Sequence, residues 1–108
     1  MKFPFKKKEF VQVAAEGAIS NGSMAEFEVG DRKVAVARIE GAYYAFDNIC
    51  THMQCPLHKG WLRGKTVVCP CHVSEFDVTN GAVVKGPAQK PVRSYPVRIE
   101  SGSIEVQV

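Results

Sequence analysis

The segments CTHMQC at residues 50–55 and CPCHVS at residues 69–74 are the most informative part of this chain. Each contains a cysteine and a histidine close together, and 16 residues separate His52 from Cys69. Two cysteines and two histidines, divided equally between the segments, form a set of metal ligands. Each segment also holds one further cysteine, which a single zinc ion would leave unexplained. The duplication therefore suggests two irons and a disulfide.

The length of 108 residues is enough for one domain with a modest core. We assign residues 1–8 to a basic amino-terminal tail and residues 9–108 to this domain. No apolar run approaches the roughly 20 residues needed to span a bilayer. The first residues are charged and lack the apolar stretch of a signal peptide. We therefore expect a soluble, cytoplasmic protein without a membrane span.

The net charge of +3 is unevenly distributed along the chain. Residues 1–8 hold four lysines, whereas residues 48–74 contain Lys59, Arg63 and Lys65 but no Asp or Glu. A protein that binds nucleic acid is expected to have a broad basic face with stacking aromatic residues, which this chain lacks. The local excess around the two cysteine segments instead predicts a docking site for an acidic protein partner.

Short alternating segments separated by turn residues predict an all-β fold. The strand-like segments are residues 10–14, 25–29, 33–39, 43–46, 66–68, 75–78, 81–85, 95–99 and 104–108. Asn80-Gly81 is the strongest hairpin turn, since both residues tolerate positive φ. A helix is expected at most as one turn around residues 14–18, because glycine and asparagine follow at once. Both cysteine segments fall in loops that follow strands.

The spacing within the first cysteine segment does not suit one tetrahedral zinc. Cys50 and His52 have a single residue between them, whereas paired zinc ligands usually stand two to four residues apart. A binuclear centre accommodates the pattern better. One iron can take Cys50 and Cys69, and the other can take His52 and His72.

This ligand pattern resembles that of the Rieske iron–sulfur proteins, whose signature is C-x-H, a gap of this size, and C-x-x-H. Residues 86–88 (GPA) are similar to the proline loop of that family, and residues 95–100 (YPVRIE) are similar to its closing segment. The resemblance covers residues 9–108. It implies a Rieske-like antiparallel β-sandwich of about three small sheets, with a cluster-binding part formed by two loops at about residues 48–88.

The resemblance also implies one 2Fe-2S cluster, with Cys50 and Cys69 on the inner iron and His52 and His72 on the outer one. Two ferric irons, two sulfides and two thiolates sum to zero charge, whereas four thiolates would make the centre negative. A neutral centre accepts an electron more easily, which raises the reduction potential by several hundred millivolts in this class. Reduction is expected on the outer iron, coupled to protonation of its imidazoles at higher pH.

Cys55 and Cys71 occupy the positions that form a disulfide in the Rieske subunits of cytochrome bc-type complexes. The resemblance therefore predicts a Cys55–Cys71 bridge that ties the two loops together. Two buried free thiols are the alternative, because disulfides are uncommon in the cytosol.

Residues that surround the cluster in the family are only partly matched. Ser74 matches a serine that hydrogen-bonds a bridging sulfide in high-potential members, although a serine here could equally serve the turn. Phe76 stands where the high-potential pattern has a tyrosine that donates to a cysteine sulfur. Gln54 and Val73 replace glycines of the two family loops. The mixture predicts a potential between those of the oxygenase-type and bc-type groups.

Five further residues near the two segments receive expectations of their own. Met53 and Leu57 form either an apolar rim around the histidines or ordinary loop packing. Pro87 is expected to close over the cluster and limit water. Trp61 is expected to be a core or cover aromatic, and His58 a solvated loop histidine with docking as the alternative.

The function that follows is one-electron transfer between redox proteins by a soluble Rieske-type ferredoxin. No substrate pocket or catalytic base is evident in the sequence, so we do not expect an enzyme. A small subunit permanently docked on a larger oxidoreductase is the alternative. A zinc-binding structural module, using Cys50, His52, Cys69 and His72, is the third reading.

Overall fold

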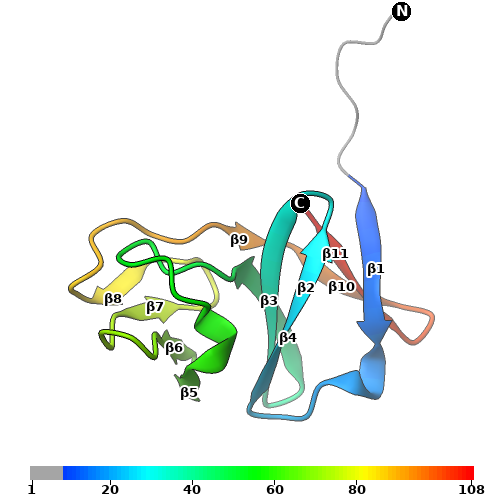
Figure 1. The fold of residues 1–108 in the computed structure, drawn as a ribbon. Coiled ribbons are helices and arrows are strands. Elements are labelled where there is room, and N and C mark those ends of the chain that lie inside the picture. The colour runs from blue at the N-terminus through cyan, green and yellow to red at the C-terminus, as the bar shows by residue number, and fades with distance from the viewer. Residues whose placement is uncertain (1–8) are drawn as a thin grey trace, which may run out of the picture.

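The computed structural model describes residues 9–108, so the basic tail at residues 1–8 lies outside the described part (Figure 1). The strands are β1 (Phe10–Ala15), β2 (Ser23–Val29), β3 (Arg32–Ile39), β4 (Ala42–Asp47), β5 (Trp61–Arg63), β6 (Thr66–Val68), β7 (Glu75–Asp77), β8 (Val83–Lys85), β9 (Ser94–Tyr95), β10 (Val97–Glu100) and β11 (Ser103–Gln107). Two short 3-10 helices, η1 (Glu16–Ala18) and η2 (Leu57–Lys59), interrupt them. In the described residues, no helix is long and apolar enough to cross a membrane.

The strands form three antiparallel sheets, which confirms the predicted fold class. Their orders are β1-β11-β10, β2-β3-β4-β9 and β5-β6-β7-β8. Figure 1 shows the first two sheets together on one side and the third sheet on the other. We call residues 9–47 and 94–108 the base, and residues 48–93 the cluster subdomain. The chain therefore leaves the base after β4 and returns to it through β9.

Strand β3 is buried on both faces, with valines on one face and alanines on the other. Val34 and Val36 pack with residues of the first sheet such as Ile104 and Val106. Ala35 and Ala37 point the opposite way and belong to a second core, shared with the cluster subdomain. Because alanines leave room for close packing, the cluster subdomain can lie directly against the base.

The second core holds residues from both cluster loops as well as from the base. Phe46, Leu57 and Phe76 are fully buried in it, together with the cysteines Cys50 and Cys69. Burying a side chain of this size contributes roughly 1.5 to 3 kcal/mol each. The same packing that stabilises the fold therefore fixes where the two loops begin.

Two differences from the sequence-based strands have a structural cause. Residues 95–99 do not form one strand, because β9 pairs with β4 and β10 pairs with β11, so the chain changes sheets at Pro96. Strand β5 was not predicted. It contains Trp61, which is 47% exposed on an edge strand of its sheet, so of the expected core or cover positions the core one is wrong.

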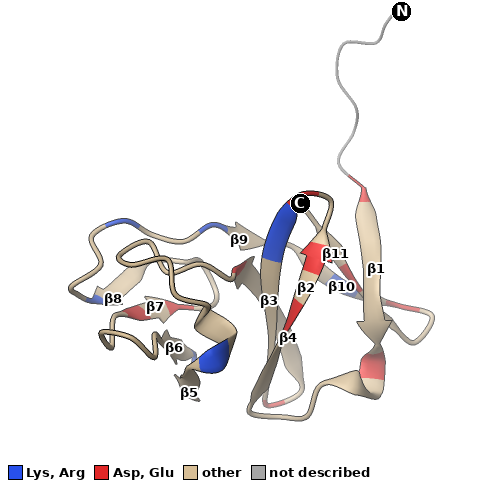
Figure 2. Ribbon diagram, in the orientation of Figure 1, with Lys and Arg blue, Asp and Glu red and all other residues tan. Residues whose placement is uncertain are grey.

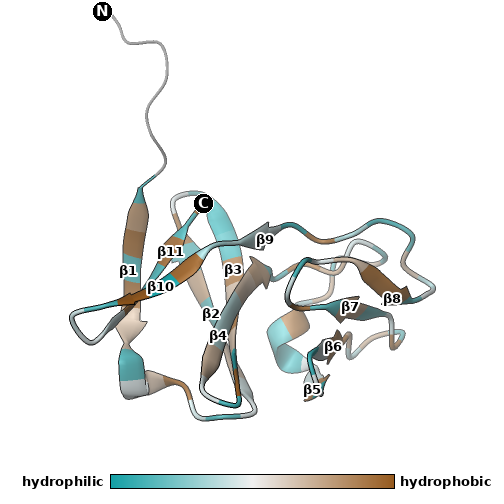
Figure 3. Ribbon diagram, turned by 180° about the vertical axis from the view of Figure 1, so that it is seen from behind, coloured by the Kyte–Doolittle hydropathy of each residue, from teal (hydrophilic) through white to brown (hydrophobic). Residues whose placement is uncertain are grey.

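The predicted Asn80-Gly81 turn is confirmed between β7 and β8. Gly81 has φ of 82°, and a Cβ there would lie 1.9 Å from the carbonyl oxygen of Val92. The glycine is thus required both by its conformation and by the returning chain. Strand β8, like β10, is an edge strand rich in hydrophobic residues (Figure 3), and each exposes one large apolar side chain, Val84 and Ile99.

Tyr95 joins the returning strand β9 to the end of β4. Its hydroxyl donates to Asp47 and accepts from the Arg32 guanidinium at 3.4 Å. Burial, followed by the hydrogen bond to Asp47 and its charge, raises the pKa of Tyr95 to about 12. The phenol is therefore held neutral in the folded protein beyond the pH at which an unfolded tyrosine ionises.

This shift predicts a loss of stability at high pH. The unfolded tyrosine releases its proton at pH near 10 and the folded one near 12. The contribution of Tyr95 to the free energy of unfolding is therefore constant below pH 10 and falls as the pH rises from 10 to 12. We expect a loss of up to about 2 kcal/mol across this window, measured by urea unfolding. Tyr95→Phe should remove the slope, whereas Tyr44→Phe should leave it. An unchanged slope in Tyr95→Phe would contradict the assignment.

Candidate metal centre

Loop 1, residues 50–55, follows strand β4 after a connection formed by Asn48 and Ile49. The backbone N–H of Cys50 donates to the carbonyl of Cys55 at 2.9 Å, and that of Gln54 donates back to the carbonyl of Cys50 at 2.8 Å. These two bonds close the loop on its first cysteine, whose side chain is buried. His52 and Met53, in the middle of the loop, are exposed.

Loop 2, residues 69–74, repeats this arrangement. The N–H of Cys69 donates to the carbonyl of Ser74 at 2.8 Å, and that of Val73 donates to the carbonyl of Cys69 at 3.1 Å. Cys69 is buried and His72 is exposed. Each loop therefore anchors a cysteine in the core and presents a histidine outward.

The fifth residue of each loop adopts the left-handed conformation. Gln54 has φ of 60° and Val73 has φ of 56°. These are the positions at which the family loops are expected to have glycine. The backbone bonds that close each loop hold the left-handed conformation here without a glycine.

The four expected ligands form two pairs. The Cys50 and Cys69 thiols are neighbours in the same core, at 0% and 1% exposure. The rings of His52 and His72 lie edge to face at the surface, with centroids 5.1 Å apart and planes at 88°. Two buried sulfurs and two exposed imidazoles, one of each from either loop, fit a cluster whose inner iron is held by cysteines and whose outer iron is held by histidines.

The surroundings of Cys69 favour a metal over a free thiolate. Burial raises the pKa of the Cys69 thiol, the Cys50 thiol beside it raises this pKa further, and backbone N–H groups of Cys71 and His72 lower it by donating to the sulfur. A bound cation would offset the cost of two buried negative sulfurs. The backbone donors would then disperse the charge that remains on the cluster.

The predicted disulfide between the loops is confirmed. Cys55 and Cys71 are bonded, with Cα atoms 6.5 Å apart and a sequence separation of 16. The Cys69 sulfur lies within 4.8 Å of both bridged sulfurs. Since bonded sulfurs are not thiolate ligands, this group of three is not a second metal site. The bridge instead closes one side of the space next to Cys69.

The proline loop is fastened to both cluster loops. The hydroxyl of buried Ser74 accepts from the N–H of Ala88 at 3.0 Å, which leaves its own proton free to donate. The hydroxyl of Thr51 donates to the carbonyl of Lys90 at 2.6 Å. Pro87 directly precedes the first attachment and is joined to Gly86 by a cis peptide bond. Segment 86–90 is therefore held beside the histidine of loop 1.

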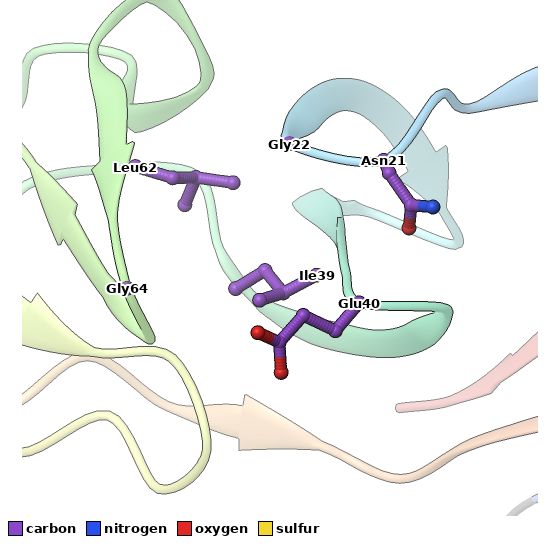
Figure 4. A pocket seen from close by; sticks show the side chains of 6 residues that line it. All are labelled: Asn21, Gly22, Ile39, Glu40, Leu62 and Gly64. Atoms are coloured by element: carbon purple, nitrogen blue, oxygen red, sulfur yellow. The ribbon is translucent and has the colours of Figure 1, made fainter.

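A hollow of about 350 Å3 opens next to His52. It is lined by Thr51, His52, Pro87, Gln89 and Lys90. Pro87 is exposed at its wall. A larger hollow of about 450 Å3 lies where the β3–β4 turn meets the β5–β6 turn (Figure 4). Its lining residues, Asn21, Gly22, Ile39, Glu40, Leu62 and Gly64, include no member of either cluster loop.

Several expectations for neighbouring residues need correction. Leu57 is fully buried, so it packs in the core and cannot form an exposed rim. Met53 is 55% exposed, as a rim residue would be. His58 is half-buried, and its N–H and ring nitrogen both bind Asn48, so it is not a solvated histidine. Phe76 is fully buried and offers no hydrogen-bond donor to the cluster.

Asn48 is a positioning residue that the sequence interpretation missed. It is 1% exposed and lies two residues before Cys50. Its side-chain oxygen accepts from the His58 N–H at 2.7 Å, and its amide donates to Glu26 at 2.7 Å and to the His58 ring at 2.8 Å. Its backbone binds Lys33 and Leu57. Asn48 thus holds strands β2 and β3 and helix η2 at the start of loop 1.

Comparison with known proteins agrees with this geometry. Residues 9–96 match the Rieske [2Fe-2S] domain. The chain belongs to this family. The Rieske domain carries a 2Fe-2S cluster, and the buried sulfurs and exposed imidazoles described above fit that group.

Relatives of this Rieske protein include carriers and a complex subunit. It is 33% identical over 94 residues to the ferredoxin component of naphthalene 1,2-dioxygenase/salicylate 5-hydroxylase systems from Ralstonia sp, covering 87% of this chain and 90% of the relative. It is 34% identical to the cytochrome b6-f complex iron-sulfur subunit of Chlorobaculum tepidum, over 97% of this chain but 59% of that subunit.

Among solved structures, the ferredoxin of carbazole 1,9a-dioxygenase from Nocardioides aromaticivorans IC177 superposes with a TM-score of 0.86. The two chains are 33% identical, and the match covers 90% of this chain and 95% of the other. A ferredoxin rather than a catalytic subunit is therefore the kind of protein that this Rieske chain resembles over nearly its full described length.

The missing donor at Phe76 leads to a prediction about the reduction potential. Phe76→Tyr places a hydroxyl in the core that contains Cys50 and Cys69, where donation to a sulfur favours the reduced cluster. A hydrogen bond worth about 1.4 kcal/mol more to the reduced form would raise the potential by about 60 mV. Protein film voltammetry measures this. Phe27→Tyr in the base is the control and should leave the potential unchanged. If Phe76→Tyr shifted the potential no more than this control, or lowered it, the proposed hydrogen bond to the cluster would be wrong.

Proposed function

We propose that this protein is a soluble, cytoplasmic one-electron carrier, a Rieske-type ferredoxin that passes electrons between a reductase and an oxygenase or similar redox protein. The observation that carries the proposal is the pairing of two buried thiols with two exposed imidazoles on loops of the same backbone form. The domain comprises residues 9–108. The relatives that are ferredoxin components of dioxygenase systems support the same role.

The expected cluster ligands lie partly in the interior and partly at the surface of the protein. When bound, the cluster supplies a site that takes up a single electron at a potential raised by its histidine ligands. Cys50 and Cys69 would hold its inner iron away from water. His52 and His72 would hold its outer iron, and their exposed ring edges give a partner the shortest approach. The Ser74 hydroxyl, whose proton is not used by its bond from Ala88, would donate to the cluster and so favour its reduced form.

The charge distribution supports docking through the cluster subdomain. Residues 48–93 hold six Lys or Arg and two acidic residues, whereas the described base holds four Lys or Arg and nine acidic residues (Figure 2). The two acids of the subdomain are engaged, Glu75 with Arg63 at 3.0 Å and Asp77 with Thr79. The opposed charges would orient the histidines toward an acidic partner during approach.

Among the cations expected to dock that partner, the structure distinguishes two groups. Lys59 and Lys65 are exposed, and Lys90 lines the hollow beside His52. Arg63 is exposed but paired with Glu75, so its charge is partly offset. We therefore assign acidic docking first to Lys90, which lies beside His52. Lys59 and Lys65, which form no ion pair within the described residues, come next, ahead of Arg63.

The proposal is tested by the composition and electron capacity of the purified protein. We expect two irons and two acid-labile sulfides per chain and the uptake of one electron in a dithionite titration. Zinc without sulfide would show a structural metal module instead, and uptake of more than one electron would contradict a single cluster.

A permanently docked subunit is the second candidate, favoured by the similarity to a cytochrome b6-f complex subunit. It is distinguished by its state when isolated from its native source. A carrier elutes as the free chain on size-exclusion chromatography, whereas a docked subunit elutes with its partner and loses stability when separated from it.

A further inference from the structure

The conformation of Val73 is unusual for its residue type. A β-branched residue rarely has positive φ, because its side chain collides with the backbone in the left-handed region. Val73 has φ of 56° in the closing turn of loop 2. The conformation costs on the order of 1 to 2 kcal/mol relative to the right-handed one. A glycine would meet the backbone requirement without that cost.

Packing does not compensate for the strain at Val73. Its side chain is 46% exposed, and Val73 belongs to neither buried core. It directly follows His72, just as Met53, 55% exposed, directly follows His52. Each outward-facing histidine thus has an exposed apolar side chain beside it. The loop hydrogen bonds require the left-handed backbone but not a valine, and strained residues of this kind are typical of functional surfaces.

We propose that Val73 and Met53 form an apolar contact patch for the redox partner, and that a valine is kept at this strained position for this contact. The proposal rests on the carrier function proposed above. The occupant is a protein surface that is apolar at its centre and bordered by carboxylates. The carboxylates are inferred from Lys90, which is exposed and lines the hollow beside His52, and from the cluster subdomain, whose two acids are both engaged.

The patch differs from the other exposed apolar residues of the chain. Val84 and Ile99 lie on edge strands of their sheets, whereas Val73 and Met53 lie in the cluster loops. A contact at the histidines shortens the path for the electron, and an apolar contact excludes water from that path. Burying what is exposed of one valine would strengthen the encounter about threefold.

Val73→Gly and Gln54→Gly form a matched pair for the test. Each removes a side chain at the same left-handed position of its loop, but only the first removes apolar surface. We expect both variants to raise the unfolding midpoint of the cluster-loaded protein, by about 2 to 6 °C, because relief of strain exceeds the entropy cost of glycine. A lower midpoint in Val73→Gly would mean that packing holds Val73, and would overturn the proposal.

Electron transfer is measured by stopped-flow oxidation of the reduced protein with two probes of equal net charge. The cobalt(III) complex of bathophenanthroline disulfonate has aromatic faces bordered by anions, whereas hexacyanoferrate(III) has no apolar face. We expect Val73→Gly and Met53→Gln to slow the aromatic probe about threefold and leave hexacyanoferrate unchanged. Gln54→Gly and Val84→Thr should affect neither probe.

The possible failures are distinguishable. Equal slowing of both probes, or no slowing of the aromatic one, would overturn the contact patch while the carrier function stands. A protein that binds no cluster, or that neither probe oxidises, would overturn the carrier function and the patch with it.

Discussion

Asn48→Ala should lower the free energy of unfolding by about 3 kcal/mol and cause rapid loss of the cluster. The substitution removes three side-chain hydrogen bonds, to Glu26 and to two atoms of His58, at a site that is 1% exposed. The His58 N–H would remain without its acceptor and a cavity would form beside Leu57. Since Asn48 precedes Cys50 by two residues, the start of loop 1 loses its support.

Urea unfolding followed by circular dichroism gives the stability, and visible absorbance gives the rate of cluster loss. Asn80→Ala is the matched control, because the Asn80 side chain is exposed and accepts one bond, from the N–H of Ala82. We expect it to cost less than about 1 kcal/mol. If the two variants were equally stable, Asn48 would not be a positioning residue.

The double variant Cys55→Ser/Cys71→Ser should be destabilised by a similar amount. The bridge closes a loop with a sequence separation of 16, and a cross-link over a loop of this length stabilises by about 3 kcal/mol. Because the bridge also lies within 4.8 Å of the Cys69 sulfur, its removal opens that side of the cluster to water. Cluster loss in air should therefore accelerate.

Reductant provides the control for this variant. Dithiothreitol should lower the stability of the native protein to that of the double variant and leave the variant unchanged. Alkylation of the unfolded, cluster-free protein without reductant should modify Cys50 and Cys69 but not Cys55 or Cys71. If all four thiols were modified, the prediction would be wrong.

Much of the fold could be predicted from local patterns. The apolar pattern of residues 10–14, 33–39 and 104–108 predicted strands, and in β11 the buried Ile104 and Val106 alternate with half-buried residues as expected. The turn at Asn80-Gly81 was predictable because positive φ depends on residue type. The disulfide was predictable from the family resemblance, because Cys55 and Cys71 occupy the positions that are bridged in bc-type Rieske subunits.

The remaining features depend on neighbours that are distant in the sequence. Leu57 and Trp61 are both large and apolar, yet Leu57 is buried in the core and Trp61 lies on an edge strand. The role of Asn48 depends on Glu26 from β2, which no local pattern relates to it. At Val73 the sequence revealed a missing glycine, but the loop hydrogen bonds decide that the left-handed conformation persists.

The loops of this protein combine features of two Rieske groups. The Cys55–Cys71 bridge and the buried Ser74 correspond to the bc-type pattern, whereas Phe76 lacks the donor of that pattern. The bridge restrains the loops whatever the potential, so it can serve a free carrier as well as a complex subunit. An intermediate potential remains our prediction.

The central claim is that Cys50, Cys69, His52 and His72 together hold one 2Fe-2S cluster. The electron paramagnetic resonance spectrum of the dithionite-reduced protein tests it most directly. The mixed ligation predicts a rhombic signal whose average g-value lies below that of a four-cysteine cluster, and which is absent from the His72→Ser variant. A signal typical of four cysteine ligands, or no signal from the reduced native protein, would contradict the account.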